Sequence, residues 1–222
     1  MNNGFQIFKT EAESIQSEYP GLLLDEEEKD TAPSISGMIH LKDENGILID
    51  RYKIKIVATI DYPNSFPYVF EIDGRIPRNN DWHIYTQDGH CCICTIPEEI
   101  LICKNGISLQ SFLENQVNPY FFNQKHREIY GYFLKERPHG IEGNVQFFIE
   151  TFKIKDLTTI IKCLVFIKQR KEPNRVNRCF CGSGLKYRKC HRETYKALNQ
   201  LSNNELNYFI EMIEHYSLYL NV

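Results

Sequence analysis

The strongest constraint on the fold is a short cysteine-rich segment near the C-terminus, CFCGSGLKYRKCH at positions 179–191. It holds three thiols and one imidazole, those of Cys179, Cys181, Cys190 and His191. The four residues form two pairs, Cys179 with Cys181 and Cys190 with His191, on either side of a Gly-Ser-Gly turn. Two ligand pairs arranged in this way can surround one tetrahedral Zn²⁺. So short a segment has no hydrophobic core of its own, and we expect a bound metal to supply most of its folding energy. A redox disulfide is the alternative, and a reducing cytosol and the terminal Cys-His pair argue against it.

These residues resemble the SEC-C motif, C-x-C-G-S-G-x-x-Y-x-x-C-H, which is best known from the bacterial preprotein-translocase motor ATPase. Lys186 and Tyr187 match that motif as well. The resemblance implies one structural zinc ion, a role in protein contact, and packing of Tyr187 over the metal segment.

The formal net charge of −3 hides a very uneven distribution. Nine Lys or Arg and a single acid, Glu172, lie between Lys168 and Arg192, so this stretch is +8 and the rest of the chain is −11. The stretch could be a solvated face, a contact for nucleic-acid phosphates, or a docking surface for an acidic protein. It contains no Phe, Tyr or Trp beyond Phe180 and Tyr187, so we expect a protein partner and no nucleic acid.

The sequence predicts a cytoplasmic protein that does not enter a membrane. Its composition, 42% hydrophobic and 25% charged, is ordinary for a globular chain. The longest apolar run, Leu157 to Ile167, is interrupted by Lys162 and is too short to span a bilayer. The N-terminus carries acids where a secretion signal would be apolar. In such a chain, clustered cysteines indicate metal binding or catalysis more than disulfides.

Periodicity predicts an α+β fold. A helix is expected over 4–18, and strands over 34–41, 47–60 and 68–72, with a turn at 43–46. Two prolines make 62–67 irregular, and the weakly periodic segment 74–97 reads as a long functional loop. Further helices are expected over 108–133 (broken near Pro119), 141–152, 156–171, 193–201 and 203–220.

A second cluster of thiols lies in that long loop and just after it. Cys91, Cys92, Cys94 and Cys103, together with His90, could supply four ligands to a metal ion. Each cysteine could instead be a small buried hydrophobe. The third interpretation is a nucleophile, because a thiolate both attacks acyl groups and leaves readily.

The order helix, strand meander, proline turn, cysteine loop and helices resembles the ubiquitin-conjugating enzymes, specifically bacterial relatives found beside cGAS-like nucleotidyltransferases in anti-phage operons. Tyr62, Pro63 and Pro67 match the family's Tyr-Pro…Pro turn, and His83 stands where its His-Pro-Asn begins. Gly89 precedes Cys92 by three residues, as a glycine precedes the family's nucleophile. The resemblance covers about residues 1–152. It implies the ubiquitin-conjugating fold, with catalytic Cys92 and His83.

The family's proline and its amide donor, asparagine, are missing, because Ile84 and Tyr85 follow His83. An oxyanion donor is worth roughly 3 to 4 kcal/mol in acyl transfer. Tyr85, His90, Asn79, Asn80 or a backbone amide could take its place.

The resemblances imply a transferase that carries the C-terminus of a partner protein as a thioester on Cys92 and passes it to an amine. The donor would be a cGAS-like nucleotidyltransferase or a ubiquitin-like protein, in anti-phage defence. The sequence shows no adenylating motif, so a separate activating enzyme is expected. The alternative is an inactive conjugating fold tethered to a zinc knuckle as a binding module. The expected domains are 1–152 (catalytic), 153–177 (connecting helix and basic linker) and 178–222 (SEC-C knuckle and C-terminal helices).

Overall fold

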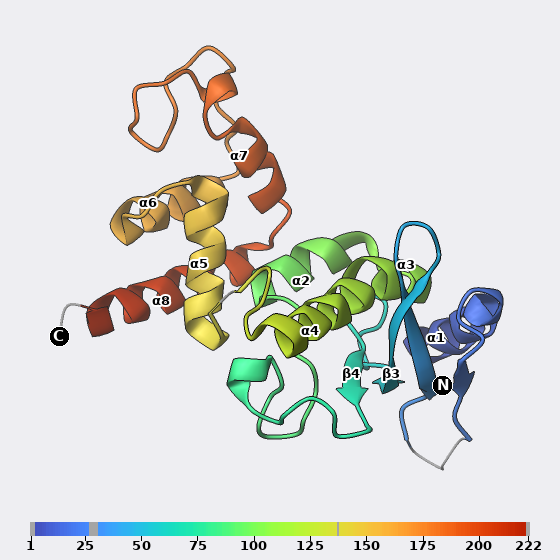
Figure 1. The fold of residues 1–222 in the computed structure, drawn as a ribbon. Helices are drawn as coiled ribbons and strands as arrows, with labels where there is room; N and C mark the ends of the chain where they lie inside the picture. Colours follow the sequence, from blue (N-terminus) through green and yellow to red (C-terminus); the bar gives the residue numbers. More distant parts are fainter. Residues whose placement is uncertain (1–2, 27–30, 137, 221–222) are drawn as a thin grey trace. The chain divides into compact units, whose positions relative to one another are not determined.

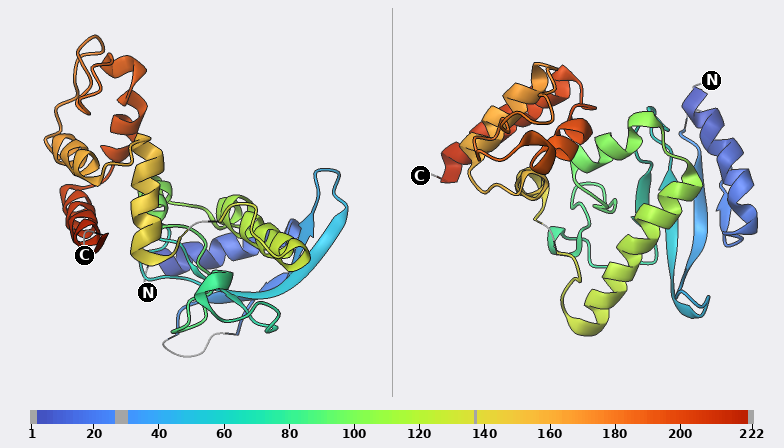
Figure 2. Two further views of the ribbon diagram at one scale, coloured as in Figure 1. Left: turned by 60° about the vertical axis from the view of Figure 1, so that its left-hand side comes forward. Right: turned by 90° about the horizontal axis from the view of Figure 1, so that it is seen from above.

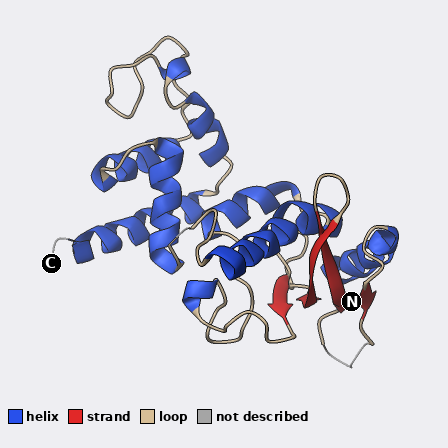
Figure 3. Ribbon diagram, viewed as in Figure 1, coloured by secondary structure: helices blue, strands red, loops and turns tan. Residues whose placement is uncertain are grey.

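The structure, a computed structural model, describes residues 3–26, 31–136 and 138–220. The chain divides into two compact units. The first comprises Met1–Cys94 and Ile102–Glu136, and the second comprises Thr95–Leu101 and Arg137–Val222. Each unit has its own hydrophobic cluster. The mixed α+β class predicted from the sequence is confirmed (Figures 1 and 3).

The first unit is built on an antiparallel meander whose strand order follows the sequence. Its strands are β1 (Leu22–Leu24), β2 (Ser34–Lys42), β3 (Leu48–Val57) and β4 (Tyr68–Glu71). The β2–β3 turn forms as predicted: the Asp43 carboxylate accepts the backbone N–H groups of Asn45 and Ile47, and Gly46 takes a positive φ of 78°. Strand β1 was not predicted, because three consecutive leucines show no alternation.

Alternation along β3 decides which face of the sheet is covered. Tyr52, Ile54 and Ile56 are buried, while the lysines between them face outward. The helices of this unit are α1 (Asn3–Ser14), continued by η1 (Ile15–Ser17), then α3 (Leu109–Phe112), the π-helical η4 (Leu113–Val117) and α4 (Asn118–Tyr130). Phe121 of α4 packs against Tyr52 with 4.7 Å between ring centroids.

The sequence predicts a break of the helical stretch near Pro119, but the helix continues through this residue. Pro119 is the second residue of α4, which continues directly from the helical residues of η4. The irregularity falls before it, in the π turn η4. A helix that periodicity did not reveal, α2 (Ile96–Ile102), and a short η3 (Cys103–Asn105) follow the cysteine loop.

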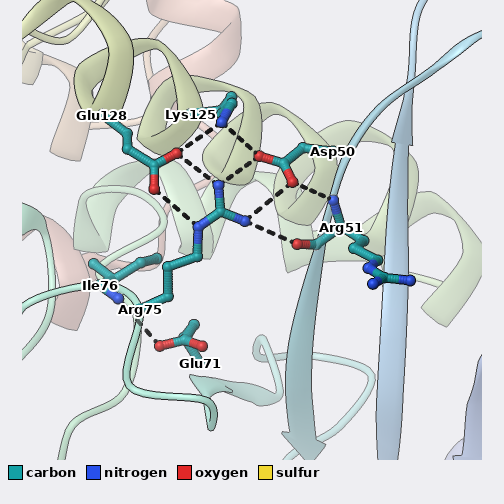
Figure 4. A network of polar contacts seen from close by, with 7 residues as sticks. All are labelled: Asp50, Arg51, Glu71, Arg75, Ile76, Lys125 and Glu128. Carbon is teal, nitrogen blue, oxygen red and sulfur yellow. Dashed lines mark hydrogen bonds and ion pairs between the residues drawn. The ribbon is translucent and has the colours of Figure 1, made fainter.

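An ionic network anchors the start of the cysteine loop to the sheet and to α4 (Figure 4). The Arg75 guanidinium contacts the Asp50 carboxylate of β3 at 2.5 Å and the Glu128 carboxylate of α4 at 2.6 Å. Lys125 reaches both carboxylates at 2.9 Å. Arg75 also lies over the Tyr52 ring, 4.3 Å from its centroid. The loop after β4 is thereby fixed at its first turn.

The second unit consists of α5 (Gly140–Phe152), α6 (Leu157–Lys168), η5 (Tyr187–Lys189), α7 (Arg192–Leu198) and α8 (Asn203–Leu220). Helices α6 and α8 lie side by side (Figure 2). Ile160, Cys163, Leu164 and Ile167 form the buried stripe of α6 at helical spacing. Cys163 is therefore a core residue. None of the helices in the described ranges is long and apolar enough to cross a membrane.

Helix α5 belongs to the second unit. The domain division expected from the sequence places it in the first domain, which was to end at residue 152. Val145, Phe148 and Phe152 of α5 pack in the core of the second unit. Periodicity identifies the buried face of a helix but not the core that receives it.

Candidate functional site

Two short segments of the first unit pair as an antiparallel ladder around the predicted nucleophile. The Cys92 N–H donates to the His83 carbonyl at 2.7 Å, and the Tyr85 N–H donates to the His90 carbonyl at 2.9 Å. Ile84 and Cys91 form the bridge between these two pairs. We call residues 83–85 and 90–92 the Cys92 ladder.

The ladder separates the two adjacent thiols, because successive side chains of an extended segment point to opposite faces. Ile84 and Cys91 are buried on one face, each 4% exposed. The other face carries the partly exposed side chains of His83, Tyr85, His90 and Cys92. The two candidate site residues, His83 and Cys92, are therefore directly opposite each other, and the choice of Cys92 over Cys91 has a structural basis.

Gly89 closes the ladder. Its N–H donates to the Tyr85 carbonyl at 2.9 Å, and its φ is +89°, a left-handed value that glycine adopts without strain. A Cβ at this position would meet the Arg78 guanidinium at 3.3 Å. The glycine three residues before Cys92 is thus required by the turn itself.

Strand β4 and helix α4 hold the ladder in place. The Cys91 N–H donates to the Val69 carbonyl of β4 at 2.7 Å. From α4, the Tyr120 hydroxyl donates to the His83 carbonyl at 2.9 Å and the Gln124 amide donates to the Trp82 carbonyl at 2.7 Å. These contacts keep His83 at a φ of 53°, which is uncommon for a residue with a Cβ and is found most often at functional sites.

The Cys92 sulfur lies among polar groups of the same ladder face. Its Sγ is 3.6 Å from the Tyr85 hydroxyl oxygen. A ring nitrogen of His83 and the Cys92 Sγ lie within 4.8 Å of each other. Burial raises the pKa of Cys92, and the hydrogen bond with Tyr85 opposes that rise. The resting sulfur is therefore mainly a thiol at neutral pH.

The other mid-chain ligands do not gather around Cys92 as one metal site. Burial raises the pKa of Cys91 to about 12, and Cys103 is 1% exposed in the core. Across the described ranges of the chain, no grouping of metal-ligand atoms combines Cys92 with Cys91, Cys94 or Cys103. The predicted combination of Cys91, Cys92, Cys94, Cys103 and His90 therefore does not form one metal site.

The predicted proline turn joins three elements of the first unit. The Tyr62 hydroxyl donates to the Glu11 carboxylate of α1, which also accepts the Leu109 N–H of α3 at 2.7 Å. The Pro63 carbonyl accepts the N–H of Ile107 at 2.9 Å. This turn supports the fold around the site and does not reach Cys92.

The C-terminal cysteines and histidine converge in the second unit. The ligand atoms of Cys179, Cys181, Cys190 and His191 all lie within 4.8 Å of one another, and we call them the Cys/His cluster. The Cys181 and Cys190 sulfurs are 3.7 Å apart. Tetrahedral Zn–S bonds of about 2.3 Å place two sulfurs roughly 3.8 Å apart, so the spacing fits zinc.

A backbone carbonyl fixes which nitrogen of His191 faces the sulfurs. Nδ1 lies 3.3 Å from the Cys190 sulfur and 3.5 Å from that of Cys179. On the opposite side of the ring, Nε2 is 2.7 Å from the Phe152 carbonyl at the end of α5, to which it donates. Metal-binding histidines are oriented by such outer contacts. The role of Phe152 could not be predicted, because a carbonyl acceptor leaves no trace in the sequence.

The segment around the cluster packs in the core of the second unit, which supplies the apolar contacts that so short a segment cannot supply itself. Tyr187 is fully buried there, and its hydroxyl donates to the Glu172 carboxylate at 3.2 Å. Phe180 stacks on Phe166 of α6 with 4.8 Å between ring centroids. Folding energy therefore comes from packing as well as from a metal.

The thiols of the cluster differ in acidity. Burial raises the pKa of Cys179 to about 11. Burial acts on Cys181 in the same direction, but hydrogen bonds with Ser183 and the neighbouring thiols lower its pKa to about 6. One member of the set thus ionises readily and can begin metal capture.

Two cations of the basic stretch make hydrogen bonds within the second unit. Arg170 donates to the carbonyls of Asn199 and Leu201, and Lys168 donates to Asn207 of α8 at 2.6 Å. The remaining exposed cations of the stretch are Lys171, Arg175, Arg178, Lys186, Arg188 and Lys189.

Comparison with known protein families matches residues 177–193 to the SEC-C motif. No curated protein and no solved structure matches the chain. SEC-C motifs are of a zinc-binding type, and the Cys/His cluster can hold a metal ion. The predicted C-terminal motif is confirmed, whereas the resemblance to ubiquitin-conjugating enzymes stays a prediction.

Proposed function

We propose that the protein is an acyltransferase of the ubiquitin-conjugating type, which carries the C-terminal acyl group of a partner protein on Cys92. The observation that carries this proposal is the Cys92 ladder, which buries Cys91 and leaves Cys92 beside His83 and Tyr85. The antiparallel meander and the sequence motifs support a ubiquitin-conjugating fold for the first unit.

The proposed reaction has two steps. In charging, the Cys92 sulfur attacks the activated acyl carbon of the donor, and a new C–S bond forms as the donor's leaving group departs. His83, within 4.8 Å of the sulfur, can accept the thiol proton directly or through one water. In transfer, an amine displaces Cys92. By resemblance, the donor is a cGAS-like nucleotidyltransferase or a ubiquitin-like protein, charged by a separate enzyme in bacterial anti-phage defence.

The second unit would add a structural zinc site and a docking surface. We propose one Zn²⁺ held by Cys179, Cys181, Cys190 and His191, since their spacing suits tetrahedral coordination. Zinc supplies folding energy to the segment. The exposed cations around it would attract an acidic protein surface and increase the rate of association.

The test uses a ubiquitin-like protein whose C-terminus carries a small-thiol thioester, so that no activating enzyme is needed. Wild-type protein should form an adduct that DTT removes, and Cys92→Ser should form a more stable oxyester. Cys94→Ser is the matched control, because it removes a neighbouring, partly exposed thiol, and it should behave as wild type. Absence of any DTT-sensitive adduct, also with a nucleotidyltransferase thioester, contradicts the proposal.

The raised pKa of Cys92 favours one rival function, a non-catalytic binding module with the same fold. Iodoacetamide discriminates between the two. A nucleophilic Cys92 should be labelled much faster than Cys163, which is fully buried with a pKa raised to about 12 by burial. Equal, slow labelling of both thiols favours the binding module.

A further inference from the structure

We infer that the Tyr85 hydroxyl stabilises the thiolate form of the Cys92 sulfur by donating a hydrogen bond to it, a role separate from that of the oxyanion donor that the missing asparagine would supply. Its role in acyl transfer rests on the proposed function, whereas its contact with the sulfur does not.

The register of the ladder places Tyr85 diagonally across from Cys92. Cys92 pairs with His83, and Tyr85 is two residues further along the same strand segment, so both side chains share one face. Diagonal neighbours in an antiparallel pair are within reach of a long aromatic side chain. In the resting thiol the Cys92 S–H donates to the Tyr85 hydroxyl oxygen, which lies 3.6 Å from Sγ. A thiolate has no proton to donate, so the direction reverses when Cys92 ionises, and the hydroxyl then donates to the sulfur.

The Tyr85 ring is held in place before any substrate arrives. It stacks on the His90 ring with 4.2 Å between centroids and 27° between the planes. The His90 Nδ1 is 2.6 Å from the Asp88 carboxylate, and the Tyr68 ring of β4 contacts the His90 ring edge to face, with 5.0 Å between the centroids. A donor fixed in this way needs no reorganisation when charge appears on the sulfur.

Among the described residues, the polar contacts of the other candidate donors do not include the Cys92 sulfur. The Asn79 side-chain oxygen caps η2 (Asn80–Trp82) by accepting the Trp82 N–H at 3.1 Å. The Asn80 side chain is exposed, and the backbone carbonyl of Asn80 accepts the His83 N–H at 2.8 Å. The His90 Nδ1 faces Asp88, and the Cys92 N–H already donates to His83. Tyr85 is the candidate whose polar atom contacts the sulfur.

The chemistry requires such a donor when the sulfur carries charge. When an amine attacks the thioester, the C–N bond forms, the C–S bond breaks, and the electron pair of the broken bond stays on Sγ. The surplus proton of the amine goes to water. The Tyr85 hydroxyl keeps its proton and donates a hydrogen bond to the thiolate, as it does when the thiolate first attacks the donor. Hydrogen bonds to ionised groups are stronger than those to neutral ones.

The experiment measures alkylation of Cys92 by iodoacetamide as a function of pH, with each cysteine followed by peptide mass spectrometry. Tyr85→Phe keeps the ring stack and removes the hydroxyl. We expect the apparent pKa of Cys92 to rise by about one unit and alkylation at neutral pH to fall about tenfold. Tyr68→Phe is the matched control, since it removes a hydroxyl from another ring that contacts His90, and it should leave the curve unchanged.

A second variant covers the case in which Tyr85→Phe disturbs folding. Replacing Tyr85 by 3-fluorotyrosine keeps the hydroxyl and makes it a stronger donor, so the apparent pKa of Cys92 should fall. A curve unmoved by both substitutions overturns the inference.

The alkylation experiment needs no acyl donor, so it separates the two proposals. If Tyr85→Phe shifts the curve but wild type never forms a thioester, the contact is confirmed and the transferase proposal fails. If the thioester forms and the curve does not move, the transferase proposal stands and the role of Tyr85 fails. If both hold, hydroxylamine should discharge the Tyr85→Phe thioester about tenfold more slowly than that of wild type.

Discussion

The Cys92 ladder and the Cys/His cluster use the same residue types, cysteine and histidine beside glycine turns, with opposite results. In the cluster, loop backbone turns four ligand atoms toward one point. In the ladder, strand-like alternation sends Cys91 into the core and leaves Cys92 on the opposite face. Convergence gives a set of ligands that can hold a metal ion, and alternation leaves one thiol of an adjacent pair on the exposed face.

One thiol of the cluster, Cys181, differs from Cys92 in acidity. Hydrogen bonds within the cluster lower the pKa of Cys181 to about 6, whereas burial raises the pKa of Cys92. A metal ligand benefits from ready ionisation. A thioester carrier must also be displaced, so its thiolate needs stabilisation during transfer, and a nearby donor can provide it.

The largest effect should follow loss of metal from the Cys/His cluster. Binding of structural zinc is worth on the order of 10 kcal/mol in zinc-finger peptides. In Cys190→Ser, hydrogen exchange at residues 175–191 should become fast, while the Cys92 ladder should stay protected. Cys94→Ser should change neither region. Continued protection of 175–191 in Cys190→Ser would show that packing alone folds the segment.

Gly89 tests the ladder itself. Gly89→Ala should cost about 1 to 2 kcal/mol, because a Cβ disfavours left-handed backbone, and should change the rate of Cys92 alkylation. The control is Gly74→Ala, where φ is +73° and nothing lies within 4 Å of the added Cβ. Urea unfolding and iodoacetamide labelling measure the two effects. Equal alkylation in both variants would mean that this turn does not position Cys92.

The pH dependence of labelling sharpens the contrast between the two thiol environments. Burial favours the neutral thiol of Cys92, so its pKa is raised and its thiolate fraction at neutral pH is lower than that of an ordinary cysteine. Alkylation of Cys92 should therefore keep increasing at pH values where free cysteine in the same solution has reached its plateau. A plateau at lower pH than that of free cysteine would contradict the assignment of burial as the dominant cause.

The smallest effect concerns the network of Figure 4. Arg75→Met should cost up to about 1 kcal/mol, because the ion pairs are partly exposed. Arg75 holds the pKa of Asp50 well below its usual 3.8, so this stabilisation is present above about pH 4 and is lost as the pH falls further. Comparing the urea midpoints of wild type and variant at neutral and acidic pH checks the sign. An unchanged difference at acidic pH would be inconsistent with it.

The sequence predicts the parts of the fold that depend on local pattern. The turn at Asp43–Gly46 and the helices near the C-terminus follow from side-chain chemistry and spacing, and the structure confirms them. Strand β1 and helix α2 could not be predicted, because each is too short for its hydrophobic periodicity to be visible in the sequence. The core that receives α5 depends on tertiary contacts between segments far apart in the sequence.

The two sites were predictable to different degrees. The Cys/His cluster is local, so its four ligands could be read from spacing, and only the Phe152 carbonyl was missed. The Cys92 ladder pairs three residues with three others across a turn. Segments this short cannot be recognised as strands from the sequence. Alternation of His83, Ile84 and Tyr85 against His90, Cys91 and Cys92 was the available signal, and pairing them required the structure.

The most direct measurement maps acylation over all eight cysteines of the zinc-loaded protein after incubation with a peptide thioester. We expect one hydroxylamine-sensitive acyl group per chain, located on Cys92. The metal should protect the thiols of the Cys/His cluster, and burial should protect Cys91 and Cys163. Acylation spread over several cysteines, or found on Cys94 in preference to Cys92, would contradict this expectation.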